Sequence, residues 1–253
     1  YDALLVLTID PGVRVESVGN YNGYARYISV QGRLDAAGVT FASTYTSATD
    51  YTIVKYESNY EDISGTLSNC TFVASPSGSR PILTIASDGV TVSGGTVLRL
   101  DIDDAAPTVT GVTFPKADPV HAYNDAGFAG FSGNIFTNPG GGRIYVSGSI
   151  NGGTDWPAIN GVAAYVLEGM VSLYHHEPWT DNNGNGIPEP TDNNGQWDPG
   201  EPFTDYNGNG VYDALLVLTI DPGVRVESVG TSNRYISVQG RLDATGVTFV
   251  STY

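Results

Sequence analysis

The feature that most constrains this fold is a long sequence that the chain contains twice. Residues 1–19 (YDALLVLTIDPGVRVESVG) recur without change at 212–230, and residues 26–45 (RYISVQGRLDAAGVTFASTY) recur at 234–253 with two substitutions. Internal repeats indicate stacked units or arrays. Because the two copies lie 211 residues apart, the repeated object is a domain and not a single turn of a solenoid. The sequence therefore predicts a segment of a tandem array.

The repeat divides the chain into three regions. We predict one domain over residues 1–176, a linker rich in Gly, Pro, Asp and Asn over 177–213, and the first coils of the next copy over 212–253. The third region is too short to bury a core alone, and its last strands would expose unpaired backbone edges. We therefore expect it to be unstable alone or to find a partner. Both ends have the same sequence, so such contacts would be head-to-tail and would generate filaments.

Short runs of β-branched and aromatic residues, separated by turn residues, fill most of the first domain. Examples are LLVLTI at 4–9, YTIVKY at 51–56 and RIYVSGSI at 143–150. No segment before about residue 157 has helical periodicity, which indicates an all-β fold. A sandwich, a barrel and a β-helix all fit this pattern. Residues 158–173 (AINGVAAYVLEGMVSL) are predicted to be a short helix or a last apolar strand pair, capping an open end.

Several phrases resemble the opening coils of bacterial right-handed parallel β-helix proteins of the pectate-lyase-like class. They are LTIDPGVRVESVG followed by YISVQGRLDAAGVTF, and SGNIFTN at 132–138. The resemblance covers most of residues 1–150 and implies a right-handed parallel β-helix; a β-sandwich is the alternative. Four phenylalanines are spaced by 31, 42 and 22 residues along the chain. Coils of roughly 20 residues would accommodate these spacings if each phenylalanine marks one coil and the longest gap contains a further coil without a phenylalanine. These residues are Phe41, Phe72, Phe114 and Phe136.

Charge and cysteine content exclude several classes of function. The chain has 27 acidic and 11 basic residues and a formal net charge of −16. Such a surface repels nucleic acid and anionic membranes, and it suits cations, calcium above all. No apolar run is long enough to span a bilayer, so no membrane insertion is expected. The single cysteine, Cys70, cannot form an internal disulfide and is predicted to be a small buried apolar residue. We interpret the chain, which opens on Tyr1, as a mature fragment.

The linker has the spacing of calcium-binding loops. Between 177 and 213 there are eight acidic residues and no Lys or Arg. An EF-hand-type loop places oxygen ligands at positions 1, 3, 5, 7, 9 and 12, with glycine at the sixth. A loop starting at Asp181 fits throughout, one at Asp205 fits up to an apolar twelfth position, and one at Asp192 has Trp197 in place of the glycine. The predicted ligands are Asp181, Asn183, Asn185, the Ile187 carbonyl, Glu189, Asp192, Asn194, Gln196, Asp198, Glu201, Asp205, Asn207, Asn209, the Val211 carbonyl and Asp213, with Asp2 as the equivalent of Asp213 in the first copy.

The same stretch is similar to the calcium loops of thrombospondin type 3 repeats and dockerins. This resemblance covers about 34 residues and implies structural Ca²⁺ and an extracellular or cell-surface location. Calcium in the linker would then set the angle between successive domains. The alternative is a flexible polar linker with Asn-Gly turns.

One acidic cluster invites comparison with enzymes built on β-helix folds, which cleave acidic polysaccharides. Asp101, Asp103 and Asp104 lie near Arg99, and lyases of that class combine aspartate calcium ligands with a basic residue. The alternative for this cluster is a solvated turn. His121 is isolated in the sequence and suggests no site.

These observations favour an extracellular structural or adhesive repeat protein, rigidified by calcium and assembling head-to-tail with copies of itself into a surface fibre. We expect no enzymatic activity. One alternative is a polysaccharide lyase or hydrolase on a β-helix. Another is a calcium-dependent carbohydrate-binding module, in which some of the sixteen tyrosines would line a sugar-binding face. Extracellular polysaccharide is the partner that both alternatives would require.

Overall fold

The fold is built from short strands. In the computed structural model, the described residues contain 24 strands and no helix, so they include no helix that is long and apolar enough to cross a membrane. The structure describes residues 5–17, 27–43, 51–58, 62–74, 80–174, 216–230 and 234–252.

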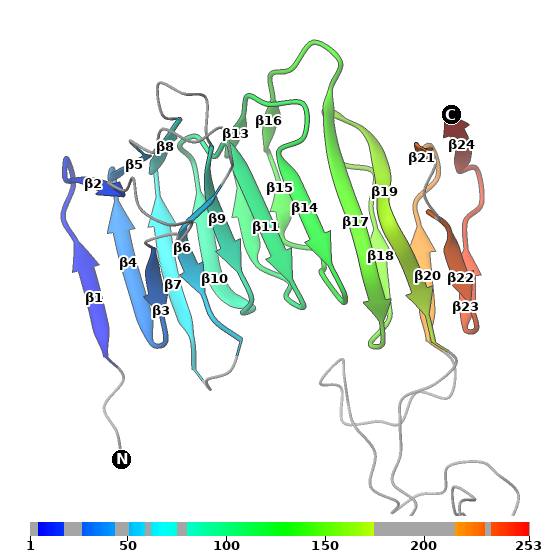
Figure 1. Cartoon of the computed structure of the whole chain (residues 1–253), viewed down its shortest axis with the longest axis horizontal. Helices are drawn as coiled ribbons and strands as arrows, with labels where there is room; N and C mark the ends of the chain where they lie inside the picture. Colours follow the sequence, from blue (N-terminus) through cyan, green and yellow to red (C-terminus); the bar gives the residue numbers. More distant parts are fainter. Residues whose placement is uncertain are drawn as a thin grey trace, which may run out of the picture.

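The chain passes through three sheets in turn, and each passage is called a coil below (Figure 1). The first sheet has the order β1 (Val6–Ile9), β4 (Arg33–Ala37), β7 (Ser64–Ser68), β10 (Gly89–Ser93), β12 (Thr108–Thr110) and β15 (Phe131–Ser132). The second consists of β2 (Arg14–Ser17), β5 (Thr40–Ser43) and β8 (Thr71–Val73), and bridges through Thr96 continue it to β13 (Thr113–Phe114) and β16 (Ile135–Phe136).

The third sheet is the longest, with ten strands. Its order is β3 (Ile28–Val30), β6 (Tyr51–Tyr56), β9 (Pro81–Ile85), β11 (Arg99–Asp103), β14 (Val120–Tyr123), β17 (Gly142–Ile150), β19 (Val162–Leu173), β21 (Arg225–Val229) and β24 (Thr248–Thr252), and β22 (Ile236–Val238) also pairs with β19. A fourth sheet contains β18 (Thr154–Trp156), β20 (Val217–Ile220) and β23 (Arg241–Asp243).

All strand pairings between the described strands are parallel, and most strands pair with a strand of the next coil. This confirms the all-β prediction and is compatible with a parallel β-helix. It excludes the β-sandwich alternative for these residues, because sandwich sheets are antiparallel.

Apolar side chains fill the space that the sheets enclose, and stacked phenylalanines follow the second sheet. Phe41 stacks on Phe72 with ring centroids 5.0 Å apart, and Phe114 stacks on Phe136 at 5.1 Å. Between these pairs the chain makes the unmarked coil that the spacing predicted. There Thr96 bridges to both neighbouring coils, and the following residue, Val97, is buried.

The segment predicted as a helix or a capping strand pair is a single 12-residue strand, β19. The prediction of a cap was wrong, because β19 pairs with β17 on one edge and with β21 and β22 on the other. Pairing on both edges satisfies its backbone donors and acceptors, and six of its twelve residues are buried.

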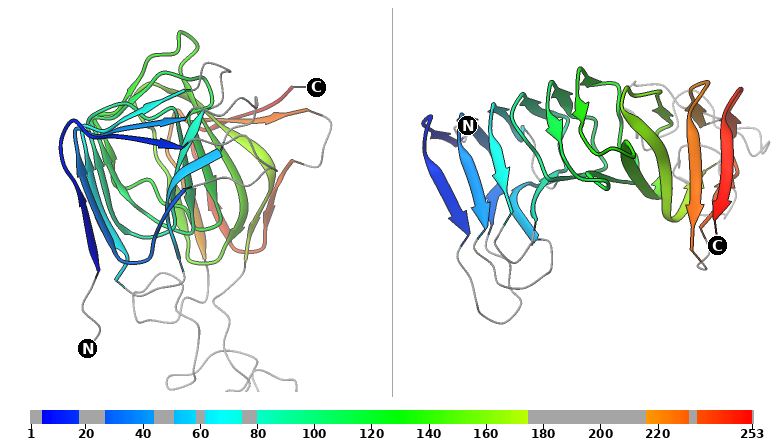
Figure 2. Two further views of the ribbon diagram at one scale, coloured as in Figure 1. Left: turned by 60° about the vertical axis from the view of Figure 1, so that its left-hand side comes forward. Right: turned by 90° about the horizontal axis from the view of Figure 1, so that it is seen from above.

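The second copy of the repeated sequence extends the sheets of the first (Figures 1 and 2). β20 pairs with β18, and β21 and β22 pair with β19. Strand pairing therefore orients the second copy on the first, an arrangement that the sequence did not predict. The predicted linker, 177–213, lies outside the described residues.

Candidate functional site

The predicted calcium ligands lie outside the residues that the structure describes. This holds for all of those from Asp181 to Asp213 and for Asp2. Within the described ranges, no group of three or more His, Cys, Asp or Glu side chains has the geometry of a metal site. The calcium loops therefore remain a prediction from sequence.

The junction between the two copies joins parts of the chain that lie far apart in the sequence. β18 and β20 pair in the register Thr154–Leu218, Asp155–Thr219 and Trp156–Ile220. Just beyond these strands, the amide of Asp221 donates to the Trp156 carbonyl (3.1 Å), and the amide of Ala158 donates to Asp221 Oδ2 (3.0 Å). The Asp221 side chain thus ties the second copy to the loop that follows β18.

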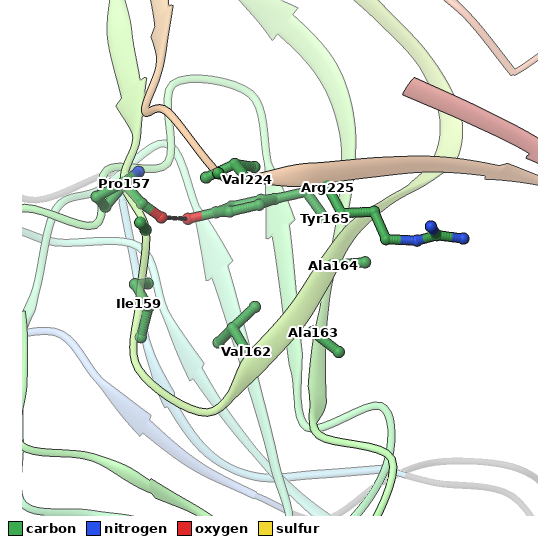
Figure 3. A pocket seen from close by; sticks show the side chains of 10 residues that line it. Pro157, Ile159, Val162, Ala163, Ala164, Tyr165, Val224 and Arg225 are labelled. Carbon is green, nitrogen blue, oxygen red and sulfur yellow. Dashed lines mark hydrogen bonds between the residues drawn. The ribbon is translucent and has the colours of Figure 1, made fainter. Parts of the chain in front are cut away.

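Two large aromatic side chains form the first copy's half of this junction. Trp156 and Tyr165 stack with ring centroids 5.3 Å apart, and both are buried. Burial raises the pKa of Tyr165, so its hydroxyl stays protonated and donates to the Pro157 carbonyl at 3.0 Å (Figure 3). Tyr165 lines a small cavity of about 70 Å³, and Val224 of the second copy lines it as well. The junction is therefore a packed interface and not a binding pocket.

A buried carboxylate joins the two copies electrostatically. Glu227, on β21, is only 6% exposed. It accepts a 2.6 Å hydrogen bond from Arg225 Nε, and Arg143 of the first copy lies 3.4 Å from its second oxygen. A buried charge costs free energy unless it is paired, so these two guanidinium groups are what allow Glu227 to lie inside the junction.

The same sequence has a different environment at the start of the chain. Leu216, Leu218 and Val224 are 2%, 0% and 6% exposed. Their identical counterparts are Leu5, Leu7 and Val13, which are 84%, 50% and 41% exposed. The difference arises because β18 and β19 cover the second copy, while in the described part of the chain no strand pairs with the outer edge of β1.

The acidic cluster identified from sequence does not converge on one point. Asp101 accepts from Arg99 Nε at 2.8 Å, while Asp103 accepts from Asn124 Nδ2 at 2.8 Å. Asp104 lies in the following turn with a left-handed φ of 51°. The arrangement matches the solvated-turn interpretation better than a set of calcium ligands.

Asp104→Asn is expected to stabilise the protein at neutral pH. Asp104 is exposed overall, but partial desolvation in the turn and the nearby Asp103 and Asp88 carboxylates raise its pKa, so its charged form is penalised in the folded state. The contribution of Asp104 to the free energy of unfolding is therefore highest at low pH, where its carboxyl is protonated. This stability is lost as pH rises through the folded-state pKa of Asp104. Asparagine removes the charge and tolerates the left-handed φ. Melting temperatures of the variant and the wild type should differ at pH 7 and converge near pH 3.

Asp155→Asn is the matched control, because Asp155 is an exposed carboxylate on β18, away from the Asp104 turn. If Asp104→Asn failed to raise the melting temperature at pH 7, or raised it equally at pH 3, charge repulsion at the turn would not be its cause.

Sequence reasoning missed a polar group on the outer face of the third sheet. His121 was considered isolated, yet its Nδ1 lies 3.0 Å from Glu168 Oε2, and its ring stacks on Tyr145 with centroids 4.8 Å apart. Forty-seven residues separate His121 from Glu168. No local pattern signals this pair, because only the register of β14, β17 and β19 brings the two side chains together.

Tyr123 belongs to the same outer face. Burial raises its pKa to about 12, and the Asp101 and Glu168 carboxylates add to this effect. It therefore stays protonated at physiological pH and can donate a hydrogen bond. Asp101 is paired with Arg99 and Glu168 with His121, so this face is a network of paired side chains.

A hollow of about 380 Å³ with a mixed polar and apolar lining lies where the first sheet ends at β15. Its lining includes Phe131, Ile135 and Ile159, and none of its lining residues is charged. The hollow therefore offers no acid or base for catalysis and no carboxylate ligand for a cation.

Comparisons with known proteins gave no relative: no protein-family model, no curated protein and no solved structure matches this chain.

Proposed function

We propose that this chain is a segment of an extracellular structural repeat protein, in which copies of one domain stack end to end as a right-handed parallel β-helix. The observation that carries this proposal is the junction, where β20 and β21 of the second copy extend the sheets of the first. Right-handedness is supported by the general rule that crossover connections between parallel strands of one sheet are nearly always right-handed.

The arrangement of the sheets supports a structural role. Each coil contacts mainly the coils beside it, as in solenoid proteins whose stability is a sum over neighbours. β1 and β24 lie at opposite ends of the row of strands (Figure 1). Such a stack grows along one axis as copies are added, which suits a fibre or a surface filament.

Electron microscopy of the protein in millimolar calcium tests this proposal. We expect elongated particles whose long axis follows the strand stack, and linear assemblies as concentration rises. Compact particles that stay monomeric at every concentration, together with an absence of bound calcium, would contradict it.

Calcium is the ion that we propose for the linker, on the ligand spacing between Asp181 and Asp213. A ligand that binds only the folded state stabilises it by about 2.7 kcal/mol per site at a hundredfold excess over its Kd. We expect chelation to lower the melting temperature, and Asp181→Ala to lower it in the presence of calcium. Calorimetry and metal analysis measure both effects.

Asp155→Ala is the control for calcium binding, because Asp155 is an exposed carboxylate outside the linker. It should leave both the calcium content and the effect of chelation unchanged. Metal analysis that finds no calcium in protein prepared with calcium would refute this part of the proposal.

A second candidate function is binding or cleavage of an acidic polysaccharide on the outer face of the third sheet. The observation that favours it is the gathering of Arg99, Asp101, His121, Tyr145 and Glu168 on neighbouring strands. Turnover of pectin or alginate that Asp101→Ala or His121→Ala abolishes would establish this function in place of the structural one. Because Arg99 is already paired with Asp101, and His121 Nδ1 with Glu168, we expect no turnover.

A further inference from the structure

We propose that residues 5–17, at the first end of the stack, form a docking surface for the 154–174 end of another copy of this domain. The inference rests on the proposed end-to-end stacking and adds the surface, the occupant and the register. It follows from one comparison within the chain, between two segments of identical sequence in two environments.

The surface formed by residues 5–17 is incomplete. Leu5, Leu7 and Val13 are exposed apolar side chains clustered on one end of the stack. Exposed apolar patches of this kind mark interaction sites in soluble proteins. Among the described strands β1 pairs only with β4, so its other edge has backbone donors and acceptors that no described strand uses.

The second copy shows what covers this sequence. In the second copy, residues identical to 5–17 are covered by β18, by the loop that follows it and by β19. Because identical side chains would meet the same surface, the occupant that we infer is the 154–174 end of a preceding copy. That copy is either earlier in the same polypeptide or in a second molecule.

The junction also specifies the contacts. By equivalence with Thr219, Thr8 would pair with Asp155 of the preceding copy. By equivalence with Asp221, Asp10 would accept a hydrogen bond from the amide of Ala158. By equivalence with Glu227, Glu16 would become buried beside Arg143. Glu16 pairs with Arg14 of its own strand, just as Glu227 pairs with Arg225.

In this chain the second copy already occupies the 154–174 end. Residues 5–17 of an incoming molecule must therefore displace residues 216–252. That segment is tethered to the same molecule and has an effective concentration in the millimolar range. A test in solution therefore needs a substitution that weakens the internal contact and leaves the incoming surface unchanged. Leu218 and its counterpart Leu7 allow this, since each can be changed separately.

The experiment uses two full-length chains. One has Thr8→Cys; the other has Asp155→Cys together with Leu218→Asp, and both keep the buried Cys70. Paired residues on neighbouring strands have a Cα separation that a disulfide can span. After mild oxidation of the mixture, we expect a disulfide-linked heterodimer, in a yield on the order of tenfold higher than without Leu218→Asp.

Leu7→Asp in the Thr8→Cys chain is the matched control, and it should abolish the cross-link. A yield that does not depend on Leu218→Asp or on Leu7→Asp would show nonspecific collision and overturn the proposal. So would the absence of a cross-link when circular dichroism shows folded protein and limited proteolysis shows that 216–252 has been released. If Leu218→Asp alone leaves the segment protected, adding Leu216→Asp removes a second buried leucine.

The outcomes separate this inference from the function on which it rests. Failure of the cross-link with elongated, calcium-binding particles would remove this docking surface and leave the structural role standing. A register-specific cross-link without calcium binding would support the surface and remove the calcium part of the proposal.

Discussion

Leu218→Asp is expected to release the second copy from the first, while Leu7→Asp at the identical sequence position should have little effect. Leu218 is fully buried in the junction, whereas half of Leu7 is exposed. We expect a loss of about 4 kcal/mol or more for Leu218→Asp, because it removes a buried leucine and places an unpaired carboxylate in an apolar site. For Leu7→Asp we expect a loss below about 1 kcal/mol, as for most exposed positions.

Hydrogen exchange measures this difference directly. In the Leu218→Asp variant, the amides of β20 and β21 should lose protection, and those of β19 should lose part of theirs, since β19 pairs with β21 and β22. In the Leu7→Asp variant, protection of these strands should be unchanged. Equal loss of protection in the two variants would mean that the second copy is not held by the junction that the structure shows.

Gly95→Ala is expected to unfold much of the first domain at moderate urea concentrations. Gly95 has a left-handed φ of 74°, and an added Cβ would lie 2.0 Å from the Cys70 carbonyl oxygen. That oxygen accepts a 2.9 Å hydrogen bond from the Thr96 amide, which connects neighbouring coils. Because the clash is with backbone, it cannot be relieved without breaking this hydrogen bond. We expect a loss of roughly 3 kcal/mol or more, in the range of severe single substitutions.

Gly111→Ala is the control that separates the clash from backbone strain. Gly111 has a similar left-handed φ of 63°, but the atom nearest to its added Cβ is the amide nitrogen of Gly94 at 3.9 Å. Its cost should be limited to the left-handed penalty of about 1–2 kcal/mol. Urea unfolding followed by circular dichroism compares the two. Equal shifts of the unfolding midpoint would show that close packing between coils is not what requires glycine at 95.

Much of the first domain could be predicted because its strands have local signals. Runs such as 51–56 and 143–150 lie within or close to strands β6 and β17, since β-branched and aromatic residues suit half-buried extended backbone. The phenylalanine spacing also predicted the coil around Thr96 correctly, because stacked rings repeat once per coil. Weaker segments such as β14 and β18 have mixed composition and gave no clear signal.

The candidate sites were less predictable, because they depend on which coils become neighbours. The interpretation of His121 as isolated failed since its partner, Glu168, lies on a strand that only the pairing register places nearby. The expected cap at 158–173 failed for a related reason: an apolar run is compatible with a helix, an end cap or a strand paired on both edges. The calcium loops lie outside the described residues, so their ligands remain predictions.

The sequence by itself determined that the chain is all-β, that it is strongly acidic, and that residues 1–19 and 212–230 are copies of one segment. Only the tertiary structure decided that these copies differ, with Leu7 half exposed at an open end and Leu218 buried against β18 and β19. Local propensity depends on a residue and its near neighbours, so it is the same in both copies. Burial depends on the strands that pair with a segment, and those come from residues far away in the chain.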